Sequence, residues 1–159
     1  MRILALITLL FLSAGYGMSA PMKTAPMSSV SAGDALRDAS SFVSKGYEVC
    51  RVEGVSMLPF YNEHAILLIK KMEFKALKPG MLVVYWDGED YVAHRLVRQG
   101  TTNWTAKGYN NKVEDPNPVT EANYNGVIAV TFYTGSAVTD LEVNKAGLSN
   151  VKTVKAKTY

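Results

Sequence analysis

The sequence is poor in the residues that build disulfide frameworks, metal centres and redox sites. It has one cysteine, Cys50, and two histidines, His64 and His94. A single cysteine excludes an intramolecular disulfide and a cysteine metal cluster. Two histidines without clustered acids give no convincing metal site. Cys50 lies in a segment that alternates like a strand, so we expect it in the core; a catalytic thiol paired with His94 is the weaker alternative. No cofactor is expected.

Excess charge, internal repeats and phosphate-cradling loops are also missing. The 159 residues carry a net charge of +3, and the lysines and arginines are scattered without forming a basic stripe. Nucleic acid is therefore not an expected partner. The length fits one domain with an N-terminal extension, and no second domain is indicated.

The one long apolar run is at the N-terminus. Met1 and Arg2 supply a positive end, Ile3–Ala14 is apolar, and small residues follow. As a helix, Ile3–Ala14 would rise about 18 Å, short of the roughly 30 Å hydrocarbon core. We expect residues 1–20 to be a cleaved signal peptide, with a marginal retained membrane anchor as the alternative. Both predict export, to the periplasm or another extracytoplasmic space, or attachment to the outer face of the membrane. The membrane surface is thus a second candidate partner.

Residues 21–30 have the composition of a linker, and residues 31–159 are expected to form a mainly β domain with a short N-terminal amphipathic helix. Ser31, followed by Asp34, has the pattern of a helix start, and apolar residues follow at helical spacing to Val43. Asp87-Gly88 predicts a hairpin turn. Residues 138–159 alternate weakly and could add an edge strand or be partly loose. The other strands are expected at 47–52, 65–69, 82–86, 91–97, 103–106 and 127–133.

Three motifs contain, in chain order, a nucleophile, a base and an acid that could orient the base. Ser56 lies in a short turn between Gly54 and Pro59, His94 lies in a strand-like run, and Asp115 lies in a polar loop. Each also has an ordinary interpretation, because turn serines, structural histidines and solvated loop acids are common. The order and the surroundings of the three residues favour chemistry.

The motifs resemble those of the type I signal peptidases, in the endoplasmic-reticulum and archaeal form that uses serine and histidine. The resemblance is carried by the box Gly54-Val55-Ser56-Met57-Leu58-Pro59, the segment Lys78 to Tyr85, the pair His94-Arg95 and the segment Lys107 to Asp115, and it covers about half the chain. Met81 and Tyr109 stand at two positions where the family usually has aspartate.

The resemblance implies a signal-peptidase-like β domain and a serine endopeptidase. Ser56 would be the nucleophile, His94 the base and Asp115 the third member that orients the imidazole. The Ser56 N–H would help to bind the oxyanion. A Ser–Lys dyad using Lys107, Lys70 or Lys71 is a weaker alternative, because it needs a buried neutral lysine.

The substrate-binding residues would be Gly54, Met57 and Pro59. Gly54 would let the substrate backbone approach, Met57 would line the pocket, and Pro59 would constrain the turn. The resemblance implies an exported precursor protein or peptide as substrate, extended against a strand edge with small residues flanking the cut. The alternatives are a catalytically inactive exported binding or assembly module with the same fold, and a dedicated processing peptidase for a single secreted partner.

Overall fold

The computed structural model describes residues 29–159, so the expected leader and most of the expected linker lie outside the described residues. Within that part, none of the helices is long and apolar enough to cross a membrane. The domain is mainly β, as expected. Its elements, in chain order, are α1 (Ala32–Val43), β1 (Tyr47–Gly54), β2 (Ile66–Lys70), the 3-10 turn η1 (Phe74–Ala76), β3 (Leu82–Trp86), β4 (Tyr91–Gln99), β5 (Asn103–Lys107), β6 (Val119–Thr120), β7 (Tyr124–Phe132), α2 (Asp140–Lys145) and β8 (Lys152–Ala156).

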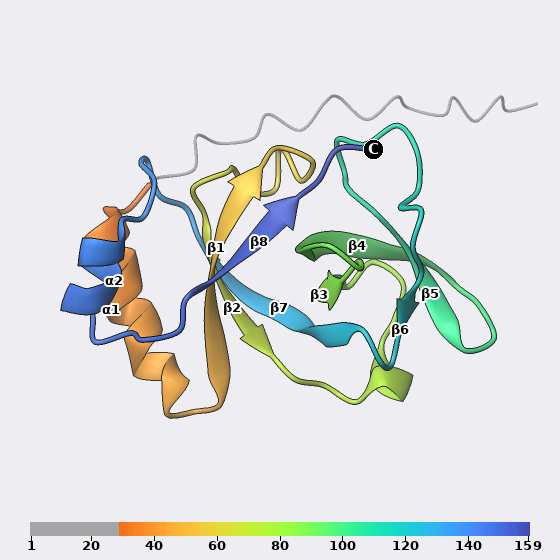
Figure 1. Ribbon diagram of the computed structural model, residues 1–159, viewed down its shortest axis with the longest axis horizontal. Helices are drawn as coiled ribbons and strands as arrows, with labels where there is room; N and C mark the ends of the chain where they lie inside the picture. Colours follow the sequence, from red (N-terminus) through yellow and green to blue (C-terminus); the bar gives the residue numbers. More distant parts are fainter. Residues whose placement is uncertain (1–28) are drawn as a thin grey trace, which may run out of the picture.

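The strands form one sheet in the order β3-β7-β2-β1-β8-β4-β5-β6, and an additional pairing of β3 with β4 closes it on itself. Neighbouring strands are antiparallel except around β8, which runs parallel to both β1 and β4. In Figure 1 the arrows of β1 and β8 lie side by side and point the same way. β8 is therefore the strand that joins the half of the sheet containing β1 to the half containing β4.

The two helices lie together at one end of the domain (Figure 1). The Ser31 side chain accepts a hydrogen bond from the Asp34 N–H (3.1 Å), which caps the start of α1 as the sequence pattern predicted. Residues of α1 such as Leu36 then pack in a cluster with Ile66 and Leu68 of β2. The helices therefore cover an apolar part of the sheet, away from the three motif residues.

The β2 strand and the β3–β4 hairpin explain how apolar patterning builds the core. Residues Ile66 to Ile69 are buried on both faces of the sheet, which fits their continuous apolar run. The hairpin joins β3 and β4 through a loop at 87–90, in which the Asp87 N–H donates to the Asp90 carbonyl (3.0 Å). The pairing of β3 with β4 stops at Trp86 and Tyr91, so the connection is longer than a two-residue turn; within it Gly88 has a positive φ (107°) and Asp87 does not.

The segment 138–159 differs most from the expectation. It contains α2, begun by a capping box between Thr139 and Glu142, which the sequence analysis missed. It then forms β8, which is an interior strand and not an edge strand. β8 is held on its two edges by pairing with β1 and β4. Its residues Val154 and Ala156 are also buried in the same apolar cluster as Val52 of β1.

Candidate active site

Ser56 is positioned by the end of β1. The strand ends at Gly54, and the following turn is closed by hydrogen bonds such as Phe60 N–H to the Met57 carbonyl (2.8 Å). The Ser56 carbonyl accepts the N–H of Asn110 (2.6 Å), which ties the turn to the loop after β5. A side chain on Gly108 would come within 2.9 Å of the Ser56 Cβ, so this close approach requires glycine. The Ser56 side chain is fully buried.

His94 lies on β4, opposite Val83 of β3. Alternation along the strand places it on the same face as Val92 and Leu96, which are buried in one apolar cluster. Its ring is completely buried, and its Nε2 lies 2.7 Å from the Ser56 Oγ. The sheet therefore brings together two residues that are 38 positions apart in the sequence.

Asp115 reaches the same histidine from the loop after β5. Its N–H donates to the Ala106 carbonyl (2.9 Å), which fixes the loop against the end of the strand. Its Oδ2 lies 2.6 Å from His94 Nδ1 and accepts a second hydrogen bond from the Tyr85 hydroxyl (2.8 Å). Both the carboxylate and the imidazole are shielded from solvent. Glu114, by contrast, forms an exposed ion pair with Arg98 (2.7 Å).

These contacts form a continuous chain from carboxylate to imidazole to hydroxyl. A carboxylate accepts the Nδ1–H, so Nε2 of a neutral imidazole faces the Ser56 hydroxyl as an acceptor. This is the arrangement in which a base can take the hydroxyl proton while the nucleophile attacks a carbonyl. Tyr85 steadies the carboxylate, and burial followed by the nearby Asp115 charge raises the pKa of its phenol, so it stays a donor.

The backbone N–H of Ser56, expected to help bind an oxyanion, has a partner within the chain. It donates to the carbonyl of Ala156 at the end of β8 (3.3 Å). Beyond Ala156, the Asn111 side chain donates to the Lys157 carbonyl (2.9 Å), and the Tyr159 ring lies edge-on to the His94 ring at 6.0 Å. The segment 156–159 therefore runs across the serine and the histidine.

The three expected substrate-binding residues have different environments. Gly54 has a φ of 103°, and a side chain there would clash with the Ala156 backbone. The backbone that lies against Gly54 is therefore that of β8, and not that of a separate substrate. Met57, expected to line the pocket, is instead fully buried in the core. Pro59 is exposed in the turn.

The two departures from the family pattern lie in loops beside the site. The Met81 sulfur accepts the Lys78 N–H (3.3 Å) within its own turn. The Tyr109 ring stacks on Phe60, with ring centres 3.8 Å apart, and the guanidinium of Arg95 lies 4.3 Å from its centre. Neither residue contacts the serine, the histidine or the aspartate through a hydrogen bond in residues 29–159.

The lysines considered as alternative bases, and Cys50, the alternative nucleophile, make contacts that do not include Ser56 or His94. The ammonium group of Lys107 donates to the Lys112 carbonyl (3.0 Å), and that of Lys71 donates to the Tyr124 carbonyl (2.6 Å). The Lys70 ammonium lies over the Tyr47 ring. Cys50 is buried in the core as expected, and burial, followed by the Glu48 charge, raises the pKa of its thiol to about 12.

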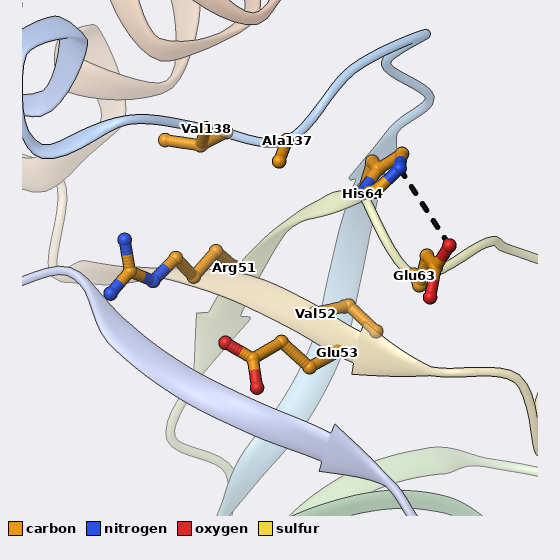
Figure 2. A pocket seen from close by; sticks show the side chains of 7 residues that line it. All are labelled: Arg51, Val52, Glu53, Glu63, His64, Ala137 and Val138. Atoms are coloured by element: carbon orange, nitrogen blue, oxygen red, sulfur yellow. Dashed lines mark ion pairs between the residues drawn. The ribbon is translucent and has the colours of Figure 1, made fainter.

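The second histidine lines a separate hollow, shown in Figure 2. His64 is half-buried and lies 3.7 Å from the Glu63 carboxylate, across the hollow from Arg51 of β1. Ala137 and Val138 also line the hollow. No serine, threonine or cysteine is among the described residues that line this hollow.

Sequence reasoning missed three residues that shape the site: Tyr85, Lys157 and Tyr159. The sequence did contain a signal for Tyr85. In the β3–β4 hairpin Val83 pairs with His94, and Tyr85, two residues further on, lies on the same face of the sheet as both. The other two belong to a segment whose position depends on long-range parallel pairing, for which the local pattern gives no signal. Comparisons of the chain with protein-family models, with curated proteins and with solved structures found no match.

Proposed function

We propose that the protein is a serine endopeptidase of the signal-peptidase type that cleaves exported precursor proteins through an acyl-enzyme. The observation that supports this most is the hydrogen-bonded chain from Ser56 Oγ to His94 Nε2 (2.7 Å) and from His94 Nδ1 to Asp115 Oδ2 (2.6 Å). Three separate segments supply these groups, and each group lies in one of the three sequence motifs. The assignment of the family remains part of this proposal.

In the proposed reaction Ser56 attacks the carbonyl of the scissile bond while His94 takes its proton and then gives it to the leaving amine. Asp115 holds the imidazole in the Nδ1–H form and stabilises the imidazolium that forms. Water then releases the acyl group by the same steps in reverse. The Ser56 N–H would stabilise the oxyanion once it is free of the Ala156 carbonyl.

The substrate would be an extended peptide that pairs with the strands beside the site. β1 leads into Ser56, and β4 contains His94, so a peptide between them would reach both. That space is filled by β8 and the residues after it. Cleavage of a separate precursor therefore requires at least the segment 156–159 to move aside.

The inactive binding or assembly module is the second candidate, and one observation favours it. The side chains of Ser56 and His94 are completely buried, and the Ser56 N–H is already paired, so the site has no free approach in this conformation. A module that binds without turnover would keep such a buried network for the stability and order that it gives. A peptidase dedicated to a single secreted partner has the same chemistry and differs in substrate range.

The deciding experiment is the Ser56→Ala variant, tested on a panel of exported precursors. By analogy with serine triads, turnover should fall by about 10⁴-fold or more. Ser41→Ala is the matched control, since Ser41 is exposed on α1. Equal cleavage by both variants, or none by the wild type, would leave the binding module as the better explanation. Precursor profiles compared with and without the protein would then distinguish a broad peptidase from one with a single partner.

A further inference from the structure

The strand β8 occupies the position that the proposed function assigns to a peptide substrate. It is an extended segment between β1 and β4, parallel to both, with Ala156 opposite Gly54 and Lys155 opposite Val92. These two neighbours are the strands that position Ser56 and His94. A peptide from elsewhere that paired with both strands would have to lie where β8 lies.

The carbonyl of Ala156 accepts a hydrogen bond from the Ser56 N–H, the kind of donor with which a serine peptidase binds the carbonyl oxygen of its substrate. The Ser56 N–H donates to this oxygen (3.3 Å), and the absence of a side chain on Gly54 makes the approach feasible. Oxyanion donors stabilise the carbonyl oxygen of the bond under attack, as its charge develops. By this criterion the bond at risk is the one that joins Ala156 to Lys157.

The side chains of the segment alternate as a bound substrate would require. Val154 and Ala156 are small, point inward and are buried. Lys155, between them, points outward and forms a partly exposed ion pair with Glu53. The small residues thus precede the bond at the positions that face the protein, and the large residue faces solvent.

The residue after the bond is anchored by three acids. The Lys157 ammonium forms ion pairs with Asp87 (2.8 Å), Asp90 (2.9 Å) and Glu89 (3.1 Å) in the β3–β4 loop. The Tyr159 hydroxyl adds a hydrogen bond to the Asp87 carboxylate (3.1 Å). Strand pairing therefore holds the chain before the bond, and the acidic loop holds it afterwards, which is the positioning that lowers the entropic part of a barrier.

We propose that Ser56 cleaves this chain's own Ala156–Lys157 bond, an inference that rests on the proposed function. Ser56 Oγ forms a bond to the Ala156 carbonyl carbon, and His94 takes the hydroxyl proton. The bond to the Lys157 nitrogen breaks, and His94 gives the proton to that nitrogen. Water hydrolyses the resulting ester and leaves a carboxylic acid on Ala156 and a free Ser56. No other reactant is needed, and the departing segment uncovers His94.

The test is the intact mass of the purified 159-residue chain and its variants during incubation at neutral pH. We expect the wild type to lose Lys157 to Tyr159 at a rate independent of protein concentration, and Ser56→Ala to remain whole. Lys157→Ala should slow the cleavage about tenfold because the acidic anchor is lost. Lys145→Ala is the matched control, because it removes the same charge from an exposed position on α2, outside the segment that is cleaved, and should cleave at the wild-type rate.

Each other outcome overturns the inference in a distinguishable way. A wild-type chain that stays whole while it cleaves the precursor panel would refute self-cleavage and leave the proposed peptidase standing. A chain that cleaves neither itself nor the panel would refute both. Cleavage that persists in Ser56→Ala, that occurs at another bond, or that accelerates with protein concentration would show that a different enzyme or a different geometry is responsible.

Discussion

The position of Asp115 predicts a large effect from a single truncation, Asp115→Ala. The carboxylate is buried and accepts hydrogen bonds from both His94 Nδ1 and the Tyr85 hydroxyl. Removal of the carboxylate leaves two buried donors without their acceptor, and each such group costs about 1–3 kcal/mol. We therefore expect the free energy of unfolding to fall by about 2–6 kcal/mol. The adjacent Glu114→Ala removes only an exposed ion pair with Arg98, and such pairs contribute about 0–1 kcal/mol.

Two measurements check this prediction without assuming any activity. Urea unfolding gives the free energy of unfolding of each variant and of the wild type. The values can be compared directly if the dependence of that free energy on urea concentration is the same for all three proteins. The ¹⁵N spectrum of labelled histidine reports the tautomer of His94, which we expect to be Nδ1–H in the wild type and in Glu114→Ala, and to shift toward Nε2–H in Asp115→Ala. Equal stability losses in the two variants, or an unchanged His94 tautomer in Asp115→Ala, would refute the role of Asp115 in orienting the imidazole.

Three further predictions follow from the packing around the site. Gly54→Ala should destabilise the fold by about 1–3 kcal/mol in thermal or urea unfolding, because φ is 103° and the new Cβ would meet the β8 backbone, whereas Gly33→Ala on α1 should be neutral or stabilising. With the pKa of Cys50 raised to about 12, about 10⁻⁴ of the thiol is ionised at pH 8, so a thiol reagent should label the protein only after unfolding; rapid labelling of the folded chain would contradict this. Burial alone would raise the pKa of Asp87, but the hydrogen bonds that it accepts from the Asp90 N–H and from Lys157 outweigh it and lower the pKa from 3.8 to about 2. The stabilisation by Asp87 should thus be complete above about pH 4 and lost as the pH falls toward 2, which the shrinking difference in urea stability between wild type and Asp87→Asn would show.

The elements that the sequence predicted well are those set by local patterns. Ser31 and Asp34 marked the start of α1, the alternation around His94 marked β4, and the Asp87-Gly88 pair marked the hairpin. Once the hairpin exists, its register decides that His94 faces the same cluster as Tyr85. Local rules therefore accounted for half of the candidate site, including the face on which the histidine lies.

The rest depends on contacts between distant segments. Parallel pairing of β8 with β1 joins residues about 100 positions apart, and a five-residue strand with alternating lysines gives no sign of an interior location. The edge-strand prediction was wrong because the inward residues Val154 and Ala156 find a buried apolar surface on both neighbours, which outweighs the polar outer face. Asp115 is similar: its motif could be recognised, but its contact with His94 follows from the loop hydrogen bond to β5.

The two residues that depart from the signal-peptidase pattern weigh less against catalysis than the covered site does. Met81 accepts a backbone N–H in the turn where the family has aspartate, and Tyr109 packs on Phe60 and Arg95. Both residues therefore contribute to loop structure, and the hydrogen-bonded chain to the serine does not pass through either of them. The covered site is the stronger objection to turnover on other proteins, because a carbonyl already occupies the Ser56 N–H. If the Ala156–Lys157 bond is itself the substrate, however, the same carbonyl lies where a serine peptidase would attack it. The intact mass of the purified chain distinguishes a site blocked by its own C-terminal segment from a site that cleaves that segment.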